Sequence, residues 1–106
     1  MDREKAIDDA EFSSGELREA LVERHSEETQ QNLEQGRVAI AGLGGLGSNV
    51  AIALTRIGVG HLHLLDFDRV DLTNLNRQQY FLDQVGRYKT EALSETLQRI
   101  NPYLDI

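Results

Sequence analysis

Two apolar runs in the second half of the chain have the length and composition of buried strands, and we expect strands over 37–42 and 61–66. The residues between them, 46–57, predict a helix that ends at Gly58. Strand, helix and strand in this order predict a βαβ unit, in which the two strands run parallel. The pattern therefore indicates an α/β protein that holds the first part of a Rossmann-like, doubly wound parallel sheet.

The same pattern continues after a long polar segment. We expect a helix over 89–100, with its apolar residues on one side and an ion pair between Glu95 and Arg99 on the other. Pro102 follows the end of this helix, and the last four residues resemble the start of a third strand. The apolar residues of the helix are Ala92, Leu93, Leu97 and Ile100.

The N-terminal third is polar and predicts helices with little apolar surface. Residues 1–12 show no apolar periodicity, so we expect them to be frayed. Ser13 and Glu16 have the spacing of a capping box, which opens a helix that runs to about Arg24 and carries Leu17 and Leu21 one turn apart. A second short helix is expected over 26–35.

Charge divides the chain near residue 35. Residues 1–35 hold 11 acidic and 4 basic residues, which accounts for the whole formal net charge of -7. We therefore expect an acidic helical extension, 1–35, followed by an α/β domain, 36–106, whose charges balance. No basic stripe indicates nucleic-acid binding, and no apolar stretch near 18 residues indicates a membrane span. Because the chain lacks a signal peptide and contains no cysteine, we expect a cytoplasmic protein that forms no thioester.

Three glycines between the first strand and its helix have the spacing G-x-G-x-x-G, namely Gly42, Gly44 and Gly47. In a nucleotide-binding unit the first permits a tight turn, the second lets backbone approach a phosphate, and the third lets the helix pack on the strand. The helix N-terminus offers N–H groups and a positive dipole end to phosphates. Asp66 follows Gly47 by 19 residues at the tip of the next strand, where a carboxylate can accept from ribose hydroxyls.

The polar segment 67–88 favours a triphosphate over a dinucleotide. Arg77 lies in this segment and Lys89 opens the helix after it, so two cations come near one strand end. A glycine turn and a helix dipole suffice for a pyrophosphate, whereas a triphosphate carries more charge than one dipole balances. Two alternatives stay open: an oxidoreductase fragment that binds NAD or FAD, and a catalytically inactive interaction module of the same fold.

A series of motifs runs from the first strand to the end of the last helix: Gly42-x-Gly44-Gly45-x-Gly47-Ser48, Gly58-Val59-Gly60, Asp66-Phe67-Asp68, Asn74-Leu75-Asn76-Arg77-Gln78, Gly86, Lys89 and Arg99-Ile100-Asn101-Pro102. In this order and spacing they resemble the adenylation region of the ubiquitin-activating-like superfamily, which includes ThiF and MoeB. The likeness covers about two thirds of the chain and is greatest to ThiF-type proteins of thiamine biosynthesis.

The resemblance implies a reaction and its participants. Such proteins bind ATP with Mg²⁺ and adenylate the C-terminal glycine carboxylate of a ubiquitin-like sulfur carrier protein. The carboxylate attacks the α-phosphorus, which gives an acyl-adenylate and releases pyrophosphate. Carried over by position, Gly45 lies against the phosphates, Asp66 binds ribose, Asn74 and Arg77 line the phosphate path, and Lys89 is the cation at the transition state.

Two further roles are implied by position. Asp68 shapes the strand end or steers a magnesium-bound water. The family also uses an arginine upstream of the first strand that reaches across a homodimer, and Arg24 is the candidate. We assign no direct metal ligand, because the family's magnesium-binding Asp and its catalytic cysteine would lie beyond Ile106. The resemblance thus implies the N-terminal part of a longer enzyme, truncated at the third strand.

Overall fold

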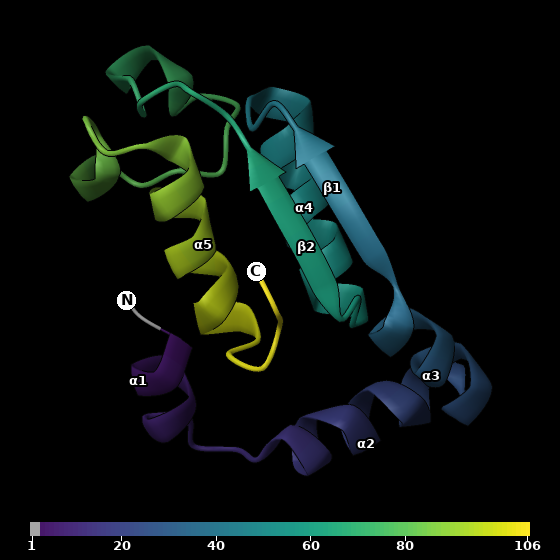
Figure 1. The fold of residues 1–106 in the computed structure, drawn as a ribbon. Helices are drawn as coiled ribbons and strands as arrows, with labels where there is room; N and C mark the ends of the chain where they lie inside the picture. Colours follow the sequence, from purple (N-terminus) through teal and green to yellow (C-terminus); the bar gives the residue numbers. More distant parts are fainter. Residues whose placement is uncertain (1–2) are drawn as a thin grey trace.

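A computed structural model describes residues 3–106 as an α/β fold built on a small parallel sheet (Figure 1). Each strand and helix expected after residue 12 is present, with its ends within one residue of the expected ones. None of the helices in residues 3–106 has the length and apolar character needed to cross a bilayer. In chain order the elements are α1 (Arg3–Asp8), α2 (Ser14–His25), α3 (Glu27–Gln35), β1 (Arg37–Ala41), α4 (Gly45–Ile57), β2 (His61–Leu65), the 3₁₀ turns η1 (Leu72–Asn74) and η2 (Leu82–Gln84), and α5 (Lys89–Ile100).

The sheet consists of β1 and β2 in parallel, with Arg37 opposite His61 and the pairing in register to the end of both strands. A third strand begins where the sequence predicts it, because Asp105 forms a parallel bridge with His61 on the other side of β2. The Leu62 amide donates to the Asp105 carbonyl at 2.8 Å. The order across the sheet is therefore β1, β2 and the start of the third strand, which leaves β1 at an edge.

Only one face of the sheet is covered by helices. Even-numbered side chains such as Ile40 and Leu62 are buried on this face, where α4 and α5 contact each other. Successive right-handed crossovers in one direction place both helices on the same side of the strands. The core formed there consists of Ile40, Leu43, Ala51, Val59, Leu62, Val70, Tyr80, Ala92, Leu93, Leu97 and Leu104.

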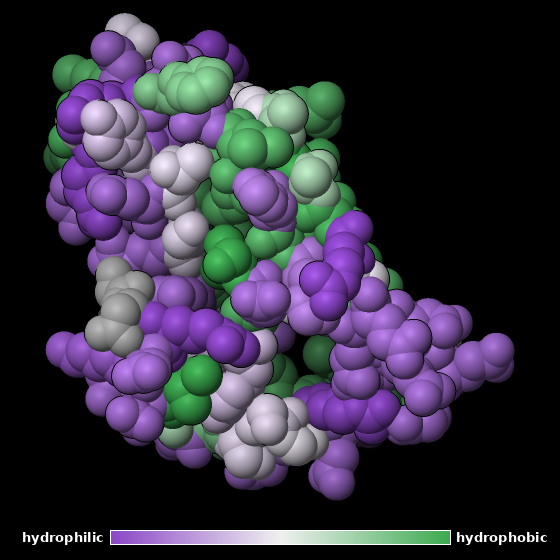
Figure 2. Space-filling view, viewed as in Figure 1, coloured by the Kyte–Doolittle hydropathy of each residue, from purple (hydrophilic) through white to green (hydrophobic). Residues whose placement is uncertain are grey.

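The opposite face of the sheet is bare. Ala39, Ala41, His63 and Leu65 are exposed on it. In Figure 2, which looks onto this side, hydrophobic surface follows the strands. A parallel sheet is normally buried on both faces, but residues 3–106 do not cover this one.

The backbone of β1 shows which groups its free edge presents. The Gly36 carbonyl accepts from the His61 amide at 3.1 Å, and the Gly42 amide donates to the Leu65 carbonyl at 2.8 Å. Because parallel pairing alternates along a strand, the even-numbered residues of β1 bond to β2. The N–H and C=O groups of odd-numbered residues, Ala39 among them, face the open edge.

The first helix corrects the expectation that residues 1–12 are frayed. Arg3–Asp8 form α1, and Ala6 is buried. The cause is tertiary, since α1 contacts α5, and a six-residue polar sequence gives no local sign of that contact. Residues 1 and 2 lie outside the described part of the chain.

The acidic helices α2 and α3 are joined to each other and to the core. The capping box of Ser13 and Glu16 is present as predicted. Arg18 forms ion pairs with Glu27 and Glu34, and its hydrogen bond holds the pKa of the Glu27 carboxyl below its ordinary value. These contacts tie the two helices together although neither has a strong apolar face.

One predicted ion pair is wrong. Glu95 bonds to Arg87 at 2.6 Å, and the structure shows no pair between Glu95 and Arg99 within residues 3–106. Arg87 precedes α5 by two residues and folds back along it, so a loop residue takes the position expected of a helix residue. Its hydrogen bond is the main reason that the pKa of the Glu95 carboxyl is lowered.

Candidate functional site

The glycine turn joins the carboxyl end of β1 to α4. Gly42 has a φ of +92°, a left-handed conformation that strongly favours glycine. A Cβ atom on Gly47 would lie 1.8 Å from the Gly42 carbonyl oxygen, so no side chain fits there. The turn and the close approach of α4 to β1 therefore both depend on these two glycines.

The N-terminus of α4 is free of side-chain caps. Gly44 is the N-cap residue and has no side chain to bond the first turn, and the first amide bonded within the helix is that of Ser48, which donates to the Gly44 carbonyl. The amides of Gly45, Leu46 and Gly47 consequently have no acceptor inside the helix. Such a terminus combines free donors with the positive end of the helix dipole and suits an anion.

Asp66 lies beside this turn with both carboxylate oxygens bonded to backbone. Its Oδ2 accepts from the Leu43 amide and its Oδ1 from the Asp68 amide, each at 2.7 Å. The carboxylate thus holds the glycine turn against the end of β2, a structural role that sequence reasoning missed. Carboxylate oxygens can accept further hydrogen bonds, so ribose binding by Asp66 stays a prediction.

Arg77 meets the glycine turn from the long segment after β2. A Cβ on Gly45 would lie 3.7–3.9 Å from Cγ, Cδ and Nε of Arg77, so the arginine stem crosses directly over this glycine. The side chain is exposed, and its Nη1 donates to the Asn76 side chain at 3.1 Å. The structure therefore brings this predicted cation to the N-terminus of α4, 32 residues away in sequence.

The residues after Arg77 hold the turn in place. The backbone amide of Gln79 donates to the Ser48 hydroxyl at 3.2 Å, and the Tyr80 hydroxyl donates to the Leu43 carbonyl at 2.7 Å. Burial raises the pKa of the Tyr80 hydroxyl, so it remains a donor throughout the ordinary pH range. Residues 77–80 thus cross the glycine turn and bond to it, a contact that the sequence did not predict. They are called the 77–80 segment below.

Asn74 and Lys89 occupy supporting positions. The Asn74 Oδ1 accepts from the Asp71 amide at 3.0 Å and closes η1. Lys89, the cation predicted at the transition state, is only 6% exposed, and its backbone amide donates to the Asp68 carbonyl at 3.0 Å. The segment 67–88 folds over the start of α5 and buries it. Lys89 therefore contributes to packing as well as charge.

Arg24 is not brought to this site within one chain. It lies in the last turn of α2, and α2 and α3 lie at the amino ends of the strands, opposite the glycine turn (Figure 1). Its side chain is exposed. Any role for Arg24 at the glycine turn requires a second molecule, as the sequence prediction of a homodimer supposes.

The site residues fit magnesium only in company with a nucleotide. Within residues 3–106, no three His, Cys, Asp or Glu side chains gather to hold a metal ion. Asp68 offers an exposed carboxylate beside Asp66. Mg²⁺ commonly takes one or two carboxylates, several waters and phosphate oxygens. Asp68 would hold such an ion through water, with phosphates supplying its remaining ligands.

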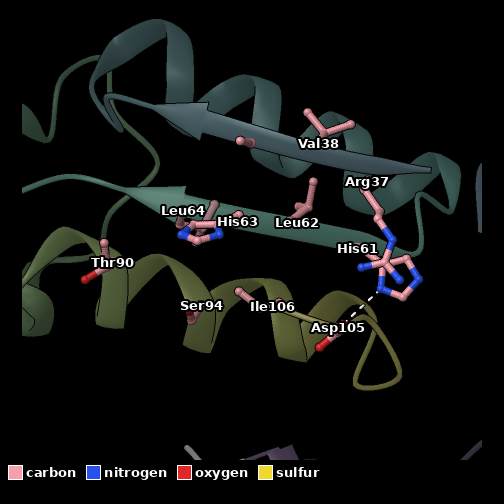
Figure 3. Close-up of a pocket in the computed structure, with 11 residues that line it drawn as sticks. Arg37, Val38, His61, Leu62, His63, Leu64, Thr90, Ser94, Asp105 and Ile106 are labelled. Atoms are coloured by element: carbon pink, nitrogen blue, oxygen red, sulfur yellow. Dashed lines mark hydrogen bonds and ion pairs between the residues drawn. The ribbon is translucent and has the colours of Figure 1, made fainter. Parts of the chain in front are cut away.

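A separate pocket lies along both strands and α5 (Figure 3). Thr90 and Ser94 of α5 line one side of it, and the His61 ring, bonded to Asp105 at 2.9 Å, closes one end. It exists because the third strand pairs with β2 only at Asp105. Arg77 and the glycine turn do not line it, so the candidate site is not here.

The parallel sheet and its glycine turn place the chain among Rossmann-like α/β proteins. Residues 17–106 match the ThiF family. The chain belongs to this family, as its motifs predicted.

Relatives with known names or solved structures agree with this family assignment. Molybdopterin-synthase adenylyltransferase from Escherichia coli strain K12 is 42% identical over 102 residues, which cover 92% of this chain and 41% of that protein. Ubiquitin-like modifier-activating enzyme 5 from Culex quinquefasciatus is 47% identical over 76 residues, covering 72% and 19%. The structure of E. coli tRNA N6-threonylcarbamoyladenosine dehydratase, TcdA, in complex with ATP aligns with a TM-score of 0.78 at 35% identity, covering 82% of this chain and 36% of that one. The chain spans less than half the length of each.

Proposed function

We propose that this chain is the nucleotide-binding part of an adenylyltransferase that activates the C-terminal glycine carboxylate of a ubiquitin-like sulfur carrier protein of the thiamine type. Family membership supports this proposal, as does the ATP complex of a 35% identical relative. The observation that carries it is the Arg77 stem lying across Gly45, at the uncapped N-terminus of α4. That arrangement brings a cation to a row of backbone amides, which supports binding of a phosphate chain there.

The proposed reaction needs charge stabilisation more than covalent help from the protein. The carrier carboxylate oxygen bonds to the α-phosphorus of ATP while the bond from that phosphorus to the bridging oxygen breaks, and pyrophosphate leaves with the electron pair. Negative charge gathers on the phosphoryl oxygens in the transition state, where fixed donors act most strongly. Arg77 and the backbone amides of Gly45 and Leu46 would supply such donors, and Lys89 would act as a second cation. Bound Mg²⁺ would neutralise part of the phosphate charge.

We also propose a homodimer in the cytoplasm. Arg24 lies at the end of the sheet opposite its own glycine turn, so it can serve a nucleotide only when a second copy presents it. A guanidinium offered in this way would bind the outer phosphates in a forked geometry.

Ligand preference tests the proposed nucleotide. Thermal unfolding of the full chain is measured with ATP–Mg²⁺, AMP and NAD at equal concentrations. We expect ATP–Mg²⁺ to raise Tm most, since a ligand at about 100 times its Kd stabilises by about 2.7 kcal/mol. Arg77→Ala should abolish most of that rise, whereas Arg56→Ala, in the last turn of α4, should keep it. A rise with NAD equal to that with ATP would favour the oxidoreductase alternative instead.

Activity needs a second assay, because an inactive module of this fold would also bind nucleotide. Exchange of labelled pyrophosphate into ATP is measured with a carrier protein ending in Gly-Gly and with the same carrier lacking its last glycine. We expect exchange only with the intact carrier. In a chain as long as its relatives, binding of ATP without exchange under either condition would identify the inactive module.

A further inference from the structure

Gln78 is the one member of the 77–80 segment that the hydrogen bonds described above leave out. It lies between Arg77, which crosses Gly45, and Gln79, which bonds to Ser48. Only 8% of the residue is exposed. Its Oε1 is buried and has no hydrogen-bond partner within residues 3–106.

The end of this side chain is directed at the glycine turn. A Cβ on Gly44 would lie 3.6 Å from Nε2 of Gln78 and 4.0 Å from its Cδ. The amide thus stands beside the N-cap of α4, next to the glycine crossed by Arg77. Its position coincides with the anion-binding terminus, and Nε2 is a donor that faces it.

Folding alone does not explain a glutamine at this place. A buried polar atom without a partner destabilises the folded chain, and an apolar side chain of similar shape is usually neutral or better. Methionine has nearly the same length and volume and would satisfy the packing. Oε1 is an acceptor and would stay unpaired beside a phosphate, so its cost comes with the amide as a whole; what methionine would lack is the Nε2 donor next to Gly44.

We propose that Gln78 is a nucleotide-positioning residue, whose side-chain amide donates to a phosphate oxygen seated beside Gly44. The proposal rests on the proposed function, because it assigns a residue to the same phosphate position. It adds a neutral donor opposite the cationic Arg77, so the phosphate is fixed from two sides. A neutral amide sets the position of an oxygen without adding charge.

The chain offers a matched control for this residue. Gln98 on α5 also has a buried Oε1 without a partner in the described part of the chain, but it lies beside α1 and far from the glycine turn in sequence. Gln78→Met and Gln98→Met therefore each remove a buried Oε1 that has no partner within residues 3–106. Both should leave Tm unchanged or raise it.

The test is isothermal titration calorimetry of the full chain with ATP–Mg²⁺ and with adenosine. We expect Gln78→Met to weaken ATP–Mg²⁺ binding about tenfold or more, the usual effect of losing a hydrogen bond to a charged group. Adenosine binding should not change. Gln98→Met should bind both as the unaltered chain does. Gln78→Glu, which keeps the shape and places a negative charge beside the phosphate, should weaken ATP binding further.

Each outcome decides one point. If the unaltered chain binds no nucleotide, the proposed function is wrong and this inference falls with it. If the unaltered chain binds ATP and Gln78→Met binds it equally well, only the inference is overturned. Equal losses for ATP and adenosine would also overturn it, since they would show that the side chain merely shapes the turn. If Gln78→Met fails to fold, unchanged ATP affinity in Gln78→Glu overturns it.

Discussion

The Tyr80 hydroxyl donates to the Leu43 carbonyl at 2.7 Å in the buried interior of the molecule, across 37 residues of sequence. Leu43 is fully buried and Tyr80 is 6% exposed. This bond joins the long segment after β2 to the turn that precedes α4. The turn is therefore held by tertiary contacts as well as by its glycines.

Removing that hydroxyl should destabilise the fold. Tyr80→Phe leaves a buried carbonyl without a partner, and we expect a loss of about 1–2 kcal/mol in the free energy of unfolding. Tyr103→Phe is the matched control, because its hydroxyl donates to the Phe12 carbonyl at the same 2.7 Å but at an exposed position. It should cost under about 0.5 kcal/mol. Urea titration of both variants measures the difference, and equal losses would contradict the account of the turn.

The two predicted cations should respond differently to substitution, because Arg77 is exposed and Lys89 is buried. Arg77→Ala should slow carrier-dependent ATP–pyrophosphate exchange by about 10²–10³-fold, in whatever longer protein is active, with folding nearly unchanged. Lys89→Ala should lower both exchange and Tm. Lys89→Met keeps the apolar stem, so it should restore Tm and leave exchange low. Normal exchange in Arg77→Ala would show that Arg77 does not belong to the proposed site.

The ion pair of Arg87 and Glu95 predicts a weak dependence of stability on acid pH. The hydrogen bond from Arg87 lowers the folded-state pKa of Glu95 below its ordinary 4.5. This contribution is therefore fully present above about pH 4.5 and is lost as pH falls through the lowered folded value. Because both side chains are about a third exposed, it should be under about 1 kcal/mol. Glu95→Gln should flatten the acid limb of a stability profile more than Glu91→Gln, an exposed substitution on the same helix.

The open edge of β1 predicts self-association of the 106-residue chain. Unpaired strand edges with apolar, uncharged residues pair readily with a second molecule. Light scattering after size exclusion should show more than one copy per particle. Ala39→Lys places a charge on the edge strand and should give monomers. His63→Lys is the control, because it places a charge on the same face of β2, whose backbone is already paired. A cooperatively unfolding monomer at high micromolar concentration would contradict this prediction.

The spacing of Leu17 and Leu21, one turn apart, predicts that α2 also contributes to that association. The structure instead places Leu21 against Gly58, where a Cβ would come within 3.0 Å of its Cδ1, and leaves both leucines partly buried. The helix therefore packs on its own chain. We now expect the contact between copies to rest on β1 alone.

Most of the fold could be predicted because its elements have local causes. The apolar runs of β1 and β2, the glycine turn and the apolar side of α5 each follow from residues close in sequence. Three features could not be predicted, because each depends on how the polar 22-residue segment 67–88 folds back. They are the burial of Lys89, the ion pair of Arg87 with Glu95, and the contacts of the 77–80 segment with the glycine turn. Polar residues carry no periodicity that reveals such contacts.

The backbone N–H groups of β1 point alternately to β2 and to the open edge. The exchange rates of its amide hydrogens therefore show whether another strand covers this edge. In a monomer, deuterium should replace the amide hydrogens of Ala39 and Ala41 quickly, while those of Val38, Ile40 and Gly42, directed at β2, exchange slowly. Any strand that docks there, from a second copy or a longer chain, would slow Ala39 and Ala41 and leave their neighbours as they were. The exchange rates of Ala39 and Ala41, two residues apart on β1, thus show whether another strand has extended the sheet.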